Sequence, residues 1–253
     1  MYDKINFKDG ETLKAEQLNH MEEGIYKNST NASGVNQTIT DFFSEMLRRL
    51  VPTFTVPFYT IKGNVAVIGD STISGYPSYA KLSTYFSLAS GYTLSDISTP
   101  GDTLKGQLNK WNALDATVRQ NLNYVFCQIG LNDIDETAED FRTYYKNLIA
   151  KIRQDAPNAM LILSTMLPCK ERWKALFPND WEAYLKRWQS ANEDIKNGYY
   201  DCDRVAYLHT DALGLYGALR AEYDHGDHIH EKPEGGKIIV FSWLSVAFNN
   251  QID

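Results

Sequence analysis

The sequence predicts an α/β protein, built as a three-layer sandwich around a five-stranded parallel sheet. Five short, mostly apolar runs are spread over the chain from residue 61 onward, and segments of helical composition separate them. Strands that alternate with helices are joined by right-handed crossovers, so the strands lie parallel and helices cover both faces of the sheet. The 253 residues, 43% of them hydrophobic, are enough for one such domain and a smaller addition.

The expected elements follow one another in a flavodoxin-like order. The strands are expected at 65–68, 92–97, 124–129, 160–164 and 205–208. Helices are expected at 78–90, 103–111, 136–154 and 234–249. The segment 171–197 forms one helix or two, because Pro178-Asn179-Asp180 interrupts it.

Residues 1–50 differ in character from the domain that follows at 61–253. A mostly apolar seam recurs there at a spacing of three and four, and its members are Leu18, Met21, Ile25, Asn28, Ala32, Val35, Ile39, Phe42 and Met46. A seam sustained for about four heptads favours a coiled coil that joins copies of the chain. The alternative is two amphipathic helices, divided near 28–34, that pack back onto the main domain. Residues 51–60 contain prolines and are expected to form a linker.

Charge and cysteine content exclude several classes of partner. The net charge is −7 without a cluster of Lys and Arg, which argues against nucleic acid and anionic membranes. The cysteines Cys127, Cys169 and Cys202 are odd in number and lack metal-type spacing, so neither a disulfide nor a zinc site is expected. The N-terminus has no apolar run and predicts no signal peptide. No cofactor is expected.

Ser71 is the first candidate catalytic residue. The apolar run 65–68 is followed by Gly69-Asp70-Ser71-Thr72, which marks a sharp exit from a strand towards a helix. In an open α/β sheet, chemistry collects at the carboxyl ends of the strands. Ser71 is therefore a candidate nucleophile, although an ordinary helix N-cap serine gives the same pattern.

Three further groups of candidate residues lie where the chain leaves a predicted strand or enters the last helix. Gly101 follows the second expected strand and allows a ligand to approach the backbone closely. Asn132 follows the third strand and supplies an amide donor, unless Asn132-Asp133 is only an Asx turn. Asp227 and His230 precede the last helix. All of them should gather on one edge of the sheet with Ser71.

These residue types belong together in acyl transfer. His230 can take the proton of the Ser71 hydroxyl, and Asp227, three residues earlier, can hold the other ring nitrogen. The backbone N–H groups of Ser71 and Gly101 and the amide of Asn132 are the candidate oxyanion donors.

Two alternative interpretations concern segment 224–230, which contains several aspartates and histidines. Pairing of Asp224 with Asp227 or with His228 would put the assignment of the base in doubt. The same cluster of histidines and aspartates could hold a metal ion, but its spacing fits no standard zinc motif, and no metal is expected.

Taken together, the four blocks resemble the SGNH (GDSL-type) hydrolase superfamily over residues 61–253. The matching residues are Gly69-Asp70-Ser71-Thr72, Gly101-Asp102-Thr103, Gly130-Leu131-Asn132-Asp133 and Asp227-x-x-His230. The resemblance implies a metal-independent esterase or deacetylase with a shallow, open active site.

A second resemblance concerns the N-terminus. The segments 6–11 and 14–25 are similar to the openings of tail or baseplate proteins of phages that infect Gram-positive hosts. This resemblance implies a protein made in the cytoplasm and released by lysis as part of a virion. It also implies a homotrimer and contacts with other tail proteins.

The residues thus predict a serine esterase that removes acyl groups. The two resemblances, rather than any single residue, imply that the acyl group is acetyl and that the substrate is a cell-surface carbohydrate. Two other functions stay open. One is a virion adhesin that binds glycan and is catalytically weak, and the other is a free cytoplasmic lipase or thioesterase. The aromatic segment 173–188 either overhangs the site or is a packed helix.

Overall fold

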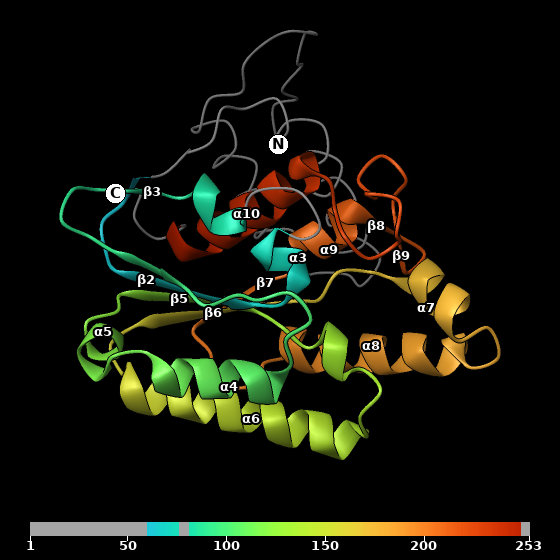
Figure 1. Cartoon of the computed structure of the whole chain (residues 1–253), viewed down its shortest axis with the longest axis horizontal. Coiled ribbons are helices and arrows are strands. Elements are labelled where there is room, and N and C mark those ends of the chain that lie inside the picture. Colours follow the sequence, from blue (N-terminus) through green and yellow to red (C-terminus); the bar gives the residue numbers. More distant parts are fainter. Residues whose placement is uncertain (1–59, 76–80, 249–253) are drawn as a thin grey trace, which may run out of the picture.

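The computed structural model describes residues 60–75 and 81–248 (Figure 1). The predicted coiled coil at 1–50, and all but the last residue of the predicted linker, lie outside the described residues. Among the described residues, no helix is both long and apolar enough to cross a membrane.

A five-stranded parallel sheet forms the centre of the domain. In spatial order its strands are β4 (Leu94–Asp96), β2 (Val65–Gly69), β5 (Tyr124–Gln128), β6 (Met160–Ser164) and β7 (Arg204–Ala206). Every residue of β2 and β5 is buried, which explains why these strands are continuous apolar runs rather than alternating ones. The second strand of the chain lies outside the first, as in flavodoxin-like doubly wound folds. The predicted fold class is confirmed.

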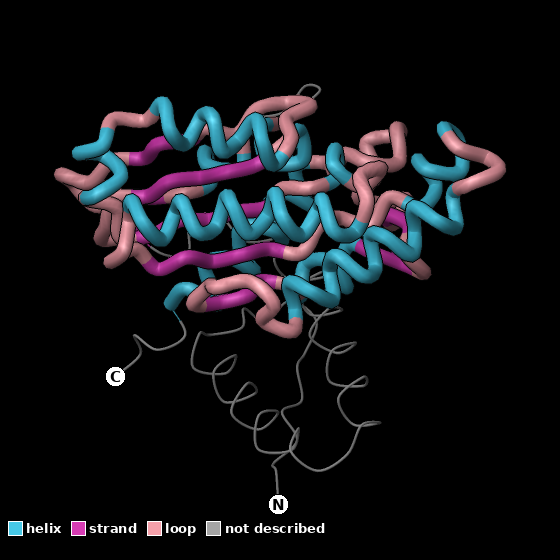
Figure 2. The backbone as a smooth tube through the Cα atoms, turned by 90° about the horizontal axis from the view of Figure 1, so that it is seen from below, coloured by secondary structure: helices cyan, strands magenta, loops and turns pink. Residues whose placement is uncertain are grey.

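Helices cover both faces of the sheet (Figures 1 and 2). One face carries α4 (Leu104–Ala113), α6 (Ala138–Asp155) and α8 (Trp181–Lys196). The other face carries α3 (Ser71–Ser74), α9 (Leu208–Leu213) and α10 (Pro233–Phe248). The buried side chains of α6 are spaced three and four residues apart, so this helix turns one apolar stripe to the sheet. Helix α10 is buried over most of its surface and is correspondingly apolar all round.

Smaller elements complete the domain. They are α5 (Ala116–Gln120), α7 (Lys170–Leu176), the 3₁₀ turns η2 (Leu82–Tyr85) and η3 (Leu131–Asp133), and the short strands β1 (Thr60–Ile61), β3 (Ser87–Leu88), β8 (Gly214–Leu215) and β9 (Ala218–Leu219). The long helical segment is two helices, α7 and α8, which are separated at the predicted interruption.

Two predicted elements are wrong. The helix expected at 78–90 is instead η2 followed by β3 over its described part, 81–90. The run Ser83 to Ser87 consists of weak helix formers, and β3 pairs in parallel with β1, which satisfies its backbone groups. The last strand ends at Ala206 rather than at Leu208, where α9 begins.

His209 lies at the centre of a buried polar cluster. Its ring approaches the Thr165 carbonyl oxygen at 3.1 Å, Ser242 Oγ at 3.3 Å and Ser164 Oγ at 3.4 Å. Burial lowers the pKa of His209 to about 4, so the ring is neutral at neutral pH.

We expect His209 to make the folded protein sensitive to acid. Between its ordinary pKa of 6.5 and about 4, the unfolded chain binds a proton that the folded chain does not. The free energy of unfolding should therefore fall as the pH is lowered, by about 3 kcal/mol in total at roughly 1.4 kcal/mol per pH unit.

The measurement is urea unfolding of the wild type and His209→Gln at pH 7, 5.5 and 4.5. Burial raises the pKa of Asp133 to about 6, and this group acts with the opposite sign in the same window. The test is therefore the difference between the two proteins. If that difference is the same at all three pH values, His209 does not carry the effect.

Candidate active site

Ser71 lies directly beyond the carboxyl end of β2, as the first residue of α3. Asp70 caps this short helix, because its carboxylate accepts hydrogen bonds from Thr72 N at 3.0 Å and Thr72 Oγ1 at 2.8 Å. A Cβ at Gly69 would lie 2.6 Å from the Cβ of Ile73, so only glycine lets the helix start this close to the strand. The serine is largely buried at the position that the sequence predicted.

The crevice of a doubly wound sheet lies where neighbouring strands send their connections to opposite faces. Here β2 and β5 are neighbours, and α3 after β2 lies on the α10 face, whereas α6 after β5 lies on the other face (Figure 1). Ser71 follows β2 and Asn132, in η3, follows β5. Both residues therefore stand at the switch point of the sheet.

The glycine and asparagine blocks are tied to each other. Asn132 Nδ2 donates to the Asp102 carbonyl oxygen at 2.8 Å, which uses one of the two amide hydrogens. The Asp133 carboxylate accepts the Leu104 N–H at 3.0 and 3.2 Å. Gly101 has a φ of 71°, and no atom of the described residues outside its own chain neighbours lies within 4 Å of where its Cβ would stand, so this part of the structure leaves the space beside it open.

The predicted Asp–His pair is formed. Asp227 Oδ2 lies 2.5 Å from His230 Nδ1, and Asp227 Oδ1 accepts the backbone N–H groups of His230 at 3.0 Å and Ile229 at 3.2 Å. Burial alone would raise the pKa of Asp227, but the hydrogen bonds from His230 hold it below its usual value. The carboxylate thus stays ionised and fixes the ring orientation of His230.

A second Asp–His pair lies on the same loop. Asp224 Oδ2 lies 2.5 Å from His228 Nδ1, and Asp224 Oδ1 accepts the N–H groups of Gly226 at 2.8 Å and His228 at 3.0 Å. Asp224 therefore does pair with His228, but this pairing does not compete with the Asp227–His230 pair, because the two pairs use different residues. The two rings differ in exposure: the His228 side chain is 49% exposed and the His230 side chain 7%.

Asp70 connects this loop with the nucleophile. Burial raises the pKa of Asp70, and the hydrogen bonds from Thr72 and the nearby charge of His230 partly offset that rise. His230 therefore lies close to the residue that precedes Ser71. The structure brings the serine block and the aspartate–histidine block to the same edge of the sheet.

Glu231 is a feature that the sequence reasoning missed. Its side chain is fully buried, and within residues 60–75 and 81–248 neither carboxyl oxygen has a hydrogen-bond partner. Burial raises the pKa of Glu231 well above its usual value, and the charges of Asp70 and Asp227 raise it further. The only signal in the sequence is Gly235-Gly236, where a Cβ at Gly235 would lie 2.9 Å from the Glu231 Cβ.

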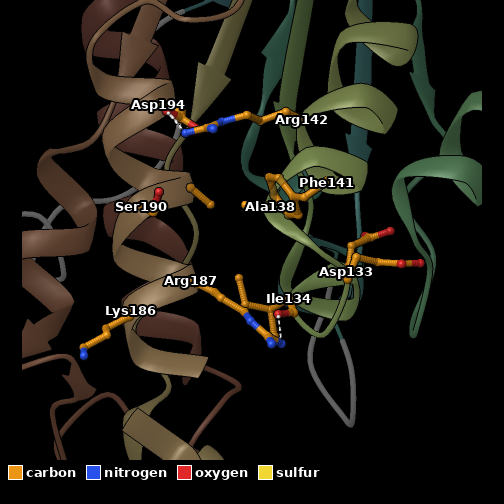
Figure 3. Close-up of a pocket in the computed structure, with 11 residues that line it drawn as sticks. Asp133, Ile134, Ala138, Phe141, Arg142, Lys186, Arg187, Ser190 and Asp194 are labelled. Carbon is orange, nitrogen blue, oxygen red and sulfur yellow. Dashed lines mark hydrogen bonds and ion pairs between the residues drawn. The ribbon is translucent and has the colours of Figure 1, made fainter. Parts of the chain in front are cut away.

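A cavity of about 180 Å³ lies elsewhere, between α6, α8 and the residues after η3 (Figure 3). Two of its arginines are engaged: Arg142 binds the Asp194 carboxylate at 2.7 and 3.1 Å, and Arg187 Nη1 donates to the backbone carbonyl oxygen of Asp135 at 3.2 Å. Neither Ser71 nor His230 lines it. We therefore assign the site to the edge beside Ser71.

Within residues 60–75 and 81–248, no group of three or more His, Cys, Asp or Glu residues could hold a metal ion.

The fold and the site together are those of an ester hydrolase: a doubly wound sheet has a serine at its switch point and an Asp–His pair on its last loop. The GDSL-like Lipase/Acylhydrolase family matches residues 67–238, and the chain belongs to this family. No curated protein matches the chain. Because the family match starts at residue 67, the phage-tail resemblance of the N-terminal segment stays a prediction.

Several solved structures share the fold. A GDSL-like lipase from Bacteroides thetaiotaomicron is 15% identical with a TM-score of 0.54, covering 75% of this chain and 89% of its own. The esterase EstA from Pseudoalteromonas is 16% identical with a TM-score of 0.53, covering 75% and 99%. A lipase/acylhydrolase from Enterococcus faecalis is 16% identical with a TM-score of 0.50, covering 74% and 97%. At these identities the likeness concerns the fold.

Proposed function

We propose that the protein is a serine esterase that removes acyl groups, acetyl above all, from a cell-surface carbohydrate. The observation that carries the proposal is the Asp227–His230 pair, at 2.5 Å, held close to the residue that precedes Ser71. An aspartate that fixes one ring nitrogen leaves the other to act on a neighbouring hydroxyl, which is the division of roles in serine hydrolases.

The reaction proceeds in two acyl transfers. Ser71 Oγ attacks the ester carbonyl carbon while His230 Nε2 takes the hydroxyl proton, and the tetrahedral intermediate then collapses. His230 returns the proton to the leaving alcohol, and the acyl group stays on Ser71. Water attacks this acyl ester and gives its proton to His230, which passes it to Ser71 Oγ as the carboxylic acid leaves.

The oxyanion is stabilised by three donors. The N–H of Ser71 lies in the first turn of α3, where backbone donors have no helical acceptor. The N–H of Gly101 borders open space, and Asn132 keeps one amide hydrogen beyond its bond to Asp102. Fixed donors of this kind act mainly on the charge that develops in the transition state.

We expect Asn132→Ala to lower kcat by about 10²- to 10³-fold with little change in KM. The amide is needed chiefly when the carbonyl oxygen becomes negative, so substrate binding is affected far less. Steady-state kinetics on p-nitrophenyl acetate measure both constants. A raised KM with unchanged kcat would make Asn132 a substrate-binding residue instead.

An open site supports a short acyl group. Asn132 and Gly101, two of the candidate oxyanion donors, are both exposed. A long acyl chain needs a continuous apolar lining to offset the cost of ordering it.

Hydrolysis of p-nitrophenyl acetate, butyrate and octanoate, together with O-acetylated oligosaccharides, tests the proposal. Acetyl esters, including those on sugars, should be cleaved with the highest kcat/KM. A preference for octanoate would favour a lipase, and no turnover of any ester would favour the glycan-binding adhesin.

We also propose that residues 13–50 join three copies of the chain, as the apolar seam and the phage-tail resemblance imply. Light scattering on the full chain and on a chain that begins at Thr60 should report a trimer and a monomer. A monomeric full chain would contradict the trimer and favour packing of these residues onto their own domain.

A further inference from the structure

Two exposed aromatic residues share a rare backbone conformation. Among the described residues, Tyr216 (φ 52°) and His228 (φ 66°) are the only non-glycine residues with positive φ. This conformation costs free energy for a residue with a bulky side chain, and it persists where the surrounding structure enforces it. Burial does not repay the cost, since Tyr216 is 85% exposed and the His228 side chain 49%. Strain of this kind clusters at functional sites.

Tyr216 stands at the tip of the β8–β9 hairpin. Its two-residue turn, Tyr216-Gly217, has positive φ at both positions, the pattern of a type I′ turn in which Asn-Gly is preferred. The turn is anchored on α7: Lys170 Nζ donates to the Tyr216 carbonyl oxygen at 2.7 Å, and Lys170 N to that of Gly217 at 2.9 Å. The backbone is thus fixed while the aromatic ring projects into solvent.

His228 is held in the same manner as His230. Asp224 binds its Nδ1 at 2.5 Å and its backbone N–H at 3.0 Å, as Asp227 does for the neighbouring pair. With Nδ1 engaged, Nε2 is the ring nitrogen that remains for another partner. The His228 ring is therefore held in one orientation, and about half of its side chain is accessible to a ligand from solution.

Both residues belong to the edge that carries Ser71. His228 is two residues from His230, so their Cα atoms are within about 7 Å. The hairpin leads into this loop through a turn in which the Arg220 carbonyl oxygen accepts the N–H groups of Tyr223 and Asp224, both at 2.9 Å. Figure 1 shows β8 and β9 beside α7, at the carboxyl end of the sheet.

We propose that Tyr216 and His228 form the sugar-binding part of the substrate site, on the alcohol side of the ester. The proposal rests on the proposed esterase function. A pyranose ring has an apolar C–H face that stacks on the Tyr216 ring, and hydroxyl groups that bond to His228 Nε2. An acyl chain would fit this surface poorly, because covering the Asp224–His228 pair with hydrocarbon removes water from polar groups without replacing its hydrogen bonds.

The test compares an acetylated oligosaccharide with ethyl acetate, whose leaving group is too small to reach Tyr216. Tyr216→Asn suits the left-handed turn and should raise the unfolding temperature. The substitution should nevertheless raise KM, and so lower kcat/KM by about tenfold, on O-acetylated oligomers of xylose or of N-acetylglucosamine. Activity on ethyl acetate should be unchanged.

Three further variants sharpen the test. Tyr216→Phe keeps the ring and should behave as the wild type, and His228→Ala should raise KM on the oligosaccharides by about tenfold. Tyr92→Asn is the matched control. Tyr92 is a tyrosine with 42% exposure that lies before the amino end of β4, away from the carboxyl ends of the strands.

The outcomes separate the two proposals. A wild type that cleaves the oligosaccharides with a KM that neither Tyr216→Asn nor His228→Ala changes would overturn the sugar site alone. Equal losses on ethyl acetate would also overturn it, since the residues would then act on the acyl transfer itself. A wild type that cleaves no acetylated oligosaccharide would overturn the carbohydrate function, and the sugar site with it.

Discussion

Ser71→Ala is expected to lower kcat by about 10⁵- to 10⁶-fold while the unfolding temperature changes little. The change removes the attacking oxygen but only one atom from the first turn of α3, whose cap at Asp70 stays in place. The residual rate comes from binding and from the oxyanion donors, which act on water as a poorer nucleophile. Hydrolysis of p-nitrophenyl acetate and a thermal unfolding curve measure the two effects.

Ser74→Ala is the matched control for this substitution. Ser74 is the last residue of the same helix, and its hydroxyl is buried without a hydrogen-bond partner in the part of the chain that the structure describes. Ser74→Ala should leave kcat unchanged and should not lower the unfolding temperature, because an unsatisfied buried polar group is costly. Near wild-type activity in Ser71→Ala would exclude a covalent mechanism through this serine.

Asp227→Asn is expected to lower kcat by about 10⁴-fold. The amide that replaces Oδ2 donates a hydrogen bond to His230 Nδ1, 2.5 Å away, and so favours the tautomer in which Nε2 already carries a proton. That ring cannot act as the base for Ser71. Initial rates on p-nitrophenyl acetate, with circular dichroism to verify the fold, measure the effect.

Asp224→Asn offers a control of the same chemistry on the same loop. Its Oδ1 can still accept from Gly226 and His228, so the loop is retained, and the small ester should be cleaved at close to the wild-type rate. A collapse of activity in Asp224→Asn, with Asp227→Asn unaffected, would transfer the role of the base to His228.

The core of the fold could be predicted because its signal is local. Strands covered on both faces must be apolar throughout, so β2, β5 and β6 stand out as runs, and their ends locate Ser71 and Asn132. The run Val205 to Leu208 predicts a strand that is too long, because a short apolar run does not distinguish the end of a strand from the start of a helix.

Other features depend on contacts that the sequence does not display. The β8–β9 hairpin lacks the usual turn signal, since Tyr216 stands where asparagine is preferred. The sequence predicts the Asp227–His230 pair, but it does not exclude a competing pairing of Asp224 with Asp227 or His228, because these residues are near one another in the chain. Only the backbone path of the loop decides which pairs form. The sequence does not indicate the burial of Glu231, because a carboxyl group is rarely enclosed without a partner, and among the described residues this one has none.

The double use of the Asp227 carboxylate couples catalysis to the order of the last loop. One oxygen orients the His230 ring, while the other holds the backbone N–H groups of Ile229 and His230. Protonation of this one group therefore releases the ring and the loop together, although the sheet beneath them remains paired. We therefore expect the opening of this loop in acid to be a local event at one edge of the sheet, which neutralisation reverses.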